Sequence, residues 1–127
     1  MAGLTRLVTR PLLLVAVLGS GLGLSACGTS SAVSQARSAC SYVGRALHEY
    51  RQSQQPSEPS AVRAALASRA LATLLRATPY AASATSADGG WNPLMTTINE
   101  AERVPLRYLV ASLTSLCAIA DSPDPYL

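Results

Sequence analysis

The sequence predicts an all-α domain, a small antiparallel bundle of about four helices. From residue 33 to residue 120, apolar residues recur at steps of three and four, which is the spacing of one face of an α-helix. No stretch alternates apolar and polar residues for long enough to form a β-strand. Prolines and the pair Gly89-Gly90 divide the pattern into segments of helical length.

The first two predicted helices are long. The first begins at Val33 and ends before Pro56, with an apolar stripe made of Val33, Ala36, Cys40, Val43, Leu47 and Tyr50. The second covers residues 57–77, because Ser57 can cap a helix and Pro59 suits a first turn, where amide protons lack partners. Its predicted apolar face consists of Val62, Leu66, Ala70, Leu71, Leu74 and Leu75.

The later segments are shorter. Residues 80–87 are rich in Ala, Ser and Thr, and both helix and loop remain open for them. Asn92-Pro93 predicts the cap and first residue of a short third helix through residue 102. Pro105 interrupts the pattern, and the last helix runs from there to about residue 120. Its apolar face is Leu106, Leu109, Val110, Leu113, Leu116, Cys117 and Ala120.

The first 26 residues have the layout of a removed export signal. Arg6 and Arg10 precede an apolar run over residues 12–24, which is too short and too rich in glycine to span about 30 Å of hydrocarbon. The run leads into Leu24-Ser25-Ala26-Cys27. This arrangement resembles a bacterial lipoprotein signal peptide with its lipobox. The resemblance implies cleavage before Cys27 and a diacylglyceryl group on its sulfur, while plain secretion and an uncleaved anchor remain as alternatives.

On this interpretation the protein is exported and held by lipid on the outer side of the cell membrane. Residues 1–26 are the signal peptide, residues 27–32 a flexible tether, residues 33–121 the helical domain and residues 122–127 a C-terminal tail. The resemblance covers only the leader, so it implies an anchor and carries no activity with it.

The lipobox also accounts for the odd number of cysteines. With lipid on Cys27, Cys40 and Cys117 remain, and outside the cytoplasm two such cysteines are expected to form a disulfide. To bridge them, the start of the first helix must lie beside the end of the last. An antiparallel bundle with an even number of helices meets this condition. We expect the bridge at the end of the bundle nearest the membrane; a reactive thiol at Cys40 is the alternative.

The charge pattern gives no support for a nucleic-acid partner. All ten basic residues are arginines, and two of them belong to the leader. Residues 27–127 hold eight arginines and seven acids, so their net charge is only +1. The composition is therefore no argument for binding nucleic acid.

No catalytic set, metal site or cofactor motif is recognisable in the sequence. His48 is the one histidine and is expected at the solvent edge of the first helix. A metal site needs three or four convergent ligands, which this chain does not offer in any clear pattern. The Gly89-Gly90 pair lacks the spacing and the lysine of a phosphate loop.

Three aromatic residues are the candidate partner-binding side chains. Trp91 follows the Gly89-Gly90 turn and is expected to cover the end of the core; exposed beside Tyr80 or Tyr108, it would instead be a binding hot spot. The favoured function is a non-enzymatic envelope lipoprotein that binds a protein or small-ligand partner. The alternatives are a small hydrolase or thiol enzyme that uses His48, and a purely structural lipoprotein.

Overall fold

The computed structural model describes residues 25–125, and all regular structure within them is helical. The α-helices are α1 (Ser25–Ser53), α2 (Ser60–Leu75), α3 (Thr78–Ala87), α4 (Asn92–Glu100) and α5 (Val110–Asp121). Two short 3-10 turns, η1 (Gly89–Trp91) and η2 (Leu106–Tyr108), precede α4 and α5. Most of the predicted signal peptide and the last two residues of the predicted tail lie outside the described residues, as does the side chain of Cys27.

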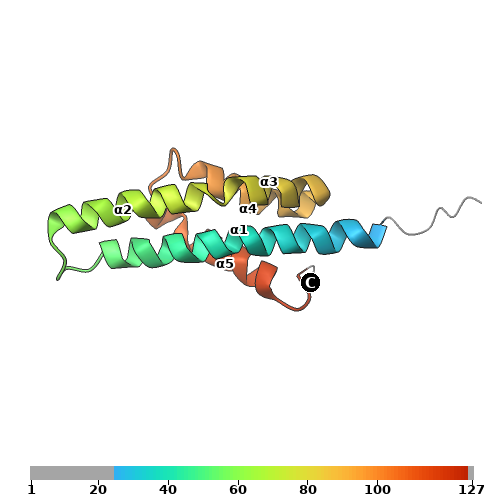
Figure 1. Cartoon of the computed structure of the whole chain (residues 1–127), viewed down its shortest axis with the longest axis horizontal. Coiled ribbons are helices and arrows are strands. Elements are labelled where there is room, and N and C mark those ends of the chain that lie inside the picture. Colours follow the sequence, from blue (N-terminus) through green and yellow to red (C-terminus); the bar gives the residue numbers. More distant parts are fainter. Residues whose placement is uncertain (1–24, 126–127) are drawn as a thin grey trace, which may run out of the picture.

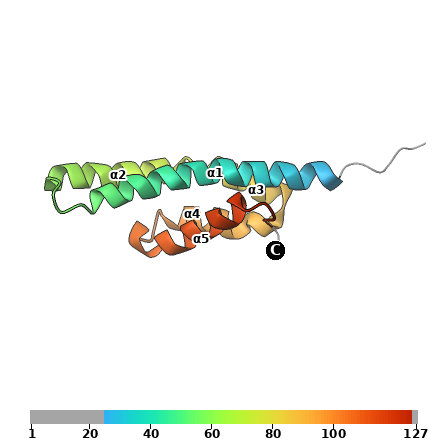
Figure 2. The same cartoon turned by 90° about the horizontal axis from the view of Figure 1, so that it is seen from below.

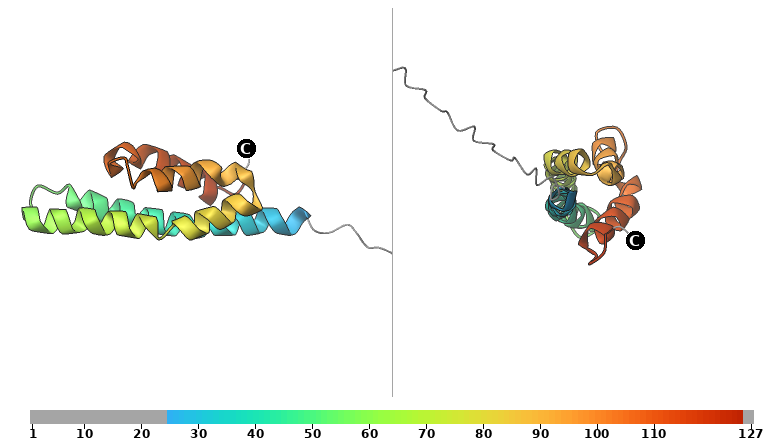
Figure 3. Two further views of the ribbon diagram at one scale, coloured as in Figure 1. Left: turned by 90° about the horizontal axis from the view of Figure 1, so that it is seen from above. Right: turned by 90° about the vertical axis from the view of Figure 1, so that its right-hand side faces the viewer.

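Successive helices run in opposite directions, apart from α2 and α3 (Figure 1). Helices α2 and α3 make one bent rod, because only two residues separate them and the amide of Ala77 still donates to the carbonyl of Leu74 at 2.9 Å. An end-on view shows α1, α2–α3, α4 and α5 placed around a shared centre (Figure 3). The all-α antiparallel bundle of about four helices, with a short third one, is therefore confirmed.

Alanine makes up much of the core. Ten of the nineteen buried hydrophobic residues are alanines, and those of α1 face those of α3 and of the turn before it. Because alanine carries only a methyl group, the two helices can approach closely along this contact. The bulk of the centre comes from five larger side chains, Val43, Leu74, Leu94, Ile98 and Leu113.

A disulfide joins the first and last helices. Cys40 of α1 and Cys117 of α5 are bridged, with their Cα atoms 5.4 Å apart and a sequence separation of 77 residues. One turn before Cys40, Arg37 donates from Nε to the carbonyl of Ala120 at 2.8 Å and from its terminal nitrogen to the carbonyl of Ser122 at 3.1 Å. A cation at a helix C-terminus satisfies free carbonyls and interacts favourably with the helix dipole. The predicted disulfide is confirmed, and Arg37 supports it.

Helix α1 is longer than predicted. It begins at Ser25 and not at Val33, so the residues expected to form a flexible tether, 27–32, are its first turns. Ala32 is fully buried, and the alanine stripe of α1 thus starts one residue before the predicted apolar face. Cys40 accordingly lies near the middle of α1. The bridge is therefore not at the end of the bundle, where we expected it.

The α4–α5 hairpin covers only part of the α1–α2 pair (Figure 2). The C-terminal turns of α1 and the N-terminal turns of α2 project beyond it. For this reason Val62, predicted to face the core, is 42% exposed; Leu71, also predicted to face it, is 36% exposed, while Ala70 and Leu74 beside it are buried. Helix α2 also begins at Ser60, three residues later than predicted, with no side-chain cap at its N-terminus.

The remaining differences concern short elements. Residues 80–87, for which helix and loop were both open, belong to helix α3, which packs Ala81 and Ala84 into the core. The predicted last helix is divided: η2 covers its first turn, and α5 begins at Val110. Pro105 precedes η2 with an extended backbone, which explains the interruption.

Loss of the disulfide should strongly destabilise the fold. In the chain-entropy model, closing a loop of this length contributes about 4 kcal/mol, a large part of the roughly 5–15 kcal/mol expected for a domain. We expect Cys40→Ser/Cys117→Ser to lower the free energy of unfolding in urea by about this amount. Reductant should have the same effect on the wild type and none on the variant. A loss below about 1 kcal/mol would show that the α5 contact with α1 does not depend on the bridge.

Candidate binding groove

A groove runs between α4 and α5 on the outer side of the short hairpin. It consists of two adjoining hollows, of about 510 Å³ and about 180 Å³, which share Pro93 and Leu116. The larger is lined by Pro93, Thr97, Ala111, Ser112, Ser115 and Leu116. The smaller is lined by Gly90, Trp91, Pro93, Leu94, Leu116, Ile119 and Pro125.

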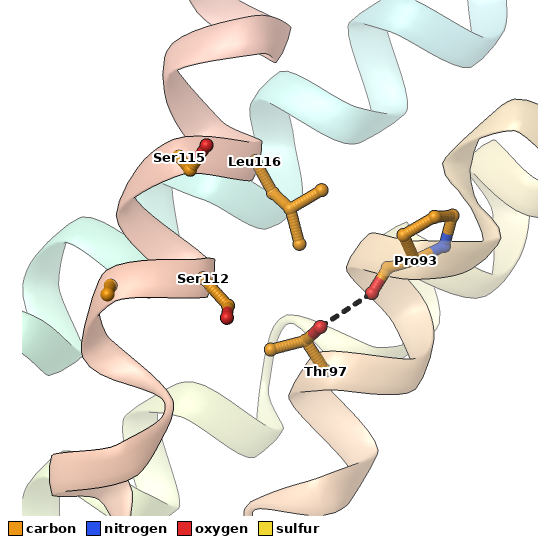
Figure 4. Close-up of a pocket in the computed structure, with 6 residues that line it drawn as sticks. Pro93, Thr97, Ser112, Ser115 and Leu116 are labelled. Carbon is orange, nitrogen blue, oxygen red and sulfur yellow. Dashed lines mark hydrogen bonds between the residues drawn. The ribbon is translucent and has the colours of Figure 1, made fainter.

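Helical spacing places these side chains on the two walls. On α4, Pro93 and Thr97 are one turn apart, and Thr97 Oγ1 donates to the carbonyl of Pro93 at 2.8 Å. On α5, Ser112 and Leu116 are also one turn apart and project toward the α4 wall (Figure 4). The inner face of α5 is occupied by Leu113, which is fully buried. The groove is therefore formed by the outer halves of two helices that are already packed together.

The lining is neutral. The residues that line the larger hollow include three with hydroxyl groups, Thr97, Ser112 and Ser115. The lining of the smaller hollow is apolar and includes Ile119, which is 43% exposed. No charged side chain lines either hollow, so neither offers an acid, a base or a cation for chemistry. Such a surface suits a neutral partner with apolar and hydrogen-bonding parts.

A third hollow, of about 280 Å³, lies between α1 and α5 beside the disulfide. Gly44, which has open space around its Cα, contributes to its width. The charged residues there, Arg51 and Asp121, come from the last turns of two antiparallel helices and so lie at opposite ends of the hollow. They make no ion pair with each other.

The three candidate aromatic residues are not gathered into one site. Trp91 is buried, with 4% exposure, and belongs to the core cluster, in agreement with the expectation that it covers the end of the core. Trp91 also contributes to the lining of the smaller hollow. Tyr108 is 64% exposed. Trp91 precedes α4 and Tyr108 follows it, so the nine residues of α4 separate these two aromatic residues. The ring of Tyr108 lies under the guanidinium of Arg107, 4.5 Å from Cζ.

Tyr80 instead pairs with Tyr42 of α1. The two half-buried rings stack with centroids 5.4 Å apart and an angle of 21° between their planes. Arg45 Cζ lies 4.3 Å from the Tyr42 ring centroid, a cation–π arrangement. The neighbouring hydroxyl of Tyr80 and, next, Arg45 lower the pKa of Tyr42, whereas the neighbouring hydroxyl of Tyr42 raises the pKa of Tyr80. Sequence reasoning missed this pair because Tyr42 and Tyr80 meet only through the α1–α3 contact.

His48 is exposed on α1 and lines none of these hollows. Within residues 25–125, no group of three or more His, Cys, Asp and Glu side chains is close enough to hold a metal ion. None of the helices described is both long and apolar enough to cross a membrane. No family model matches the chain, and comparison with curated proteins and with solved structures found no match.

The tyrosine pair should titrate in two separate steps. Tyr42 is expected to ionise first and Tyr80 second, because the interaction of their hydroxyls lowers the pKa of Tyr42 and raises that of Tyr80. In Tyr80→Phe the main cause of the shift is gone, so the pKa of Tyr42 should rise toward its ordinary value. Carbon-13 NMR of the ring Cζ atoms, assigned with Tyr42→Phe, measures both steps. An unchanged Tyr42 titration in Tyr80→Phe would contradict the pairing.

Proposed function

We propose that this protein is a lipid-anchored envelope domain that binds a partner through the α4–α5 groove and catalyses no reaction. The neutral, part-hydroxyl and part-apolar lining of the groove carries this proposal. The partner we favour is a neutral, partly apolar segment of another envelope protein. Exposed Ile119 would bury apolar surface against it, and the serines would meet its backbone polar groups.

The lipid anchor rests on Leu24-Ser25-Ala26-Cys27 and on the pairing of the other two cysteines. Because Cys40 and Cys117 are joined to each other, Cys27 is the cysteine left for modification. The helical backbone already includes Cys27, so a mature chain that begins there would start its folded part directly at the lipid. The groove would then be carried on a rigid support at the membrane.

The enzyme hypothesis has less support. A catalytic histidine needs a neighbouring nucleophile or orienting group and a cavity for substrate. His48 is exposed and lines none of the three hollows, and the hollows beside α4 hold no titratable side chain. The groove therefore supports binding over catalysis.

The anchor is tested by metabolic labelling with a fatty acid. In an expressing bacterium, we expect the wild-type protein to carry the label and fractionate with membranes. Cys27→Ser should lose the label, because the serine hydroxyl does not replace the thiol in diacylglyceryl transfer. Cys40→Ser/Cys117→Ser should keep the label and serves as a control for general loss of cysteine. Label retained by Cys27→Ser would refute the anchor.

The groove is tested by placing a photo-crosslinking residue at Ser112 in intact cells. The control probe is placed at Ser68, an exposed serine in the middle of α2 and away from the groove. We expect a discrete adduct from position 112, none from position 68, and at least a tenfold weaker adduct when Ile119→Asp is added. Trp91→Ala is a poor probe, since truncating a buried Trp costs about 3–5 kcal/mol of stability. Equal adducts from both positions would contradict the groove.

A further inference from the structure

We propose that Tyr42, Arg45, Arg76 and Tyr80 form a binding site for a phosphate ester on the side of α1 that faces away from α5. The residues come from three elements: α1, the turn that ends α2, and the first turn of α3. On α1, Cys40 faces α5 through the disulfide, and Tyr42 is two residues further, about 200° around the helix. The proposed site and the disulfide therefore lie on different sides of α1.

The site has an aromatic floor and two cations. The stacked rings of Tyr42 and Tyr80 are half-buried, so water reaches them from one side. Arg45 lies over the Tyr42 ring with its Cζ 4.3 Å from the centroid. Arg76 ends α2 and lies four residues, about one turn, before Tyr80 on the bent α2–α3 rod. Both arginines are thus neighbours of the tyrosine pair.

These two arginines have no acidic partner among the residues described. The ion pair found between residues 25 and 125 is that of Arg103 with Glu100, far along the chain on the α4 side. Glu49 follows Arg45 by one turn on α1. Its carboxylate accepts a hydrogen bond of 2.8 Å from Thr73 Oγ1 of α2. The exposed guanidinium groups therefore have N–H donors available to a ligand.

The distribution of charge along the chain favours an anion here. Residues 27–77 hold six arginines and two glutamates, whereas residues 78–127 hold two arginines and five acids. The net charge of residues 27–127 is thus near zero although the α1–α2 half is basic and the rest is acidic. An anion approaching the molecule is attracted to the first half, which supplies Tyr42, Arg45 and Arg76, while Tyr80 comes from the first turn of α3.

The donors match a phosphate ester better than a carboxylate. Two guanidinium groups offer several N–H donors, and a phosphate group presents several oxygens to them. The alkyl part of an ester can rest against the half-buried ring of Tyr80, since the Tyr42 ring is already in contact with Tyr80 and Arg45. The lowered pKa of Tyr42 is consistent with a positive potential at its oxygen, the potential that would also favour a bound anion.

Two sources share this chemistry, namely a phospholipid headgroup and a soluble phosphate ester. Tyr42 is 15 residues beyond Cys27 on one helix, which corresponds to about 22 Å. A headgroup reaches the site only if α1 lies along the membrane; otherwise the ligand is soluble. The assignment to a headgroup rests on the proposed lipid anchor, while the anion site itself does not.

The test uses the full chain in non-ionic detergent micelles. One arm adds glycerol 3-phosphate, and the other adds phosphatidylglycerol to the micelles. In each arm the pKa of Tyr42 is followed by carbon-13 NMR of its ring Cζ, and we expect the bound anion to raise it. A response to phosphatidylglycerol alone identifies a headgroup, and a response to glycerol 3-phosphate identifies a soluble ester.

The variant Arg45→Gln/Arg76→Gln removes both cations, and the matched control Arg51→Gln/Arg63→Gln removes one exposed arginine from each of the same two helices. We expect the first to raise the half-saturating concentration at least tenfold and the control to change it less than twofold. Calorimetric titration with glycerol 3-phosphate measures the binding. An unchanged circular dichroism melting curve shows that a loss of binding is not a loss of folding. Equal responses from both variants, or no response to either additive in the wild type, would overturn the site. Lipidation of Cys27 does not enter these titrations, so failure of the anchor is distinguished from failure of the site.

Discussion

The close contact of α1 with the bent α2–α3 rod is the constraint on which the rest of the structure depends. It is made largely by alanines, among them Ala36 and Ala39 on α1 and Ala81 and Ala84 on α3, all without exposed surface. Alanine loses no side-chain entropy when buried and lets helix backbones approach closely. Each methyl group, however, removes little apolar surface from water. The bundle is thus closely packed and has a thin core.

A thin core leaves the last helix in need of other attachments. Helix α5 buries Leu113 and Ala120 but exposes much of its remaining surface, so the bridge from Cys117 and the two hydrogen bonds from Arg37 carry a large share of its attachment to α1. Helix α5 is also one wall of the groove, and Leu116, which belongs to both hollows, is next to Cys117 in sequence. The shape of the groove therefore depends on a covalent link formed on the opposite side of the same helix.

Those parts of the fold that rest on strong local or covalent signals could be predicted from the sequence. Two cysteines in the first and last apolar stripes required an even number of antiparallel rods, and Asn92-Pro93 located the start of the third helix. Helix α3 and the early start of α1 were not predictable in this way. Their buried residues are alanines in segments rich in Ser and Thr, where hydrophobic periodicity is weak. The groove was missed because Thr97, Ser112 and Ser115 form no motif, and their proximity comes only from the packing of α4 on α5.

The two proposed surfaces are related through α1. The tyrosine–arginine cluster lies on the side of α1 away from α5, and the groove lies on the outer side of the α4–α5 hairpin. If the cluster binds headgroup phosphates, α1 lies along the membrane and the groove opens away from it, toward partners. If the ligand is a soluble ester, α1 can stand away from the membrane, and the projecting end of α1 and α2 becomes the part furthest from the lipid. The orientation of α1 thus decides which surface meets the membrane, and the phosphate source identifies that orientation.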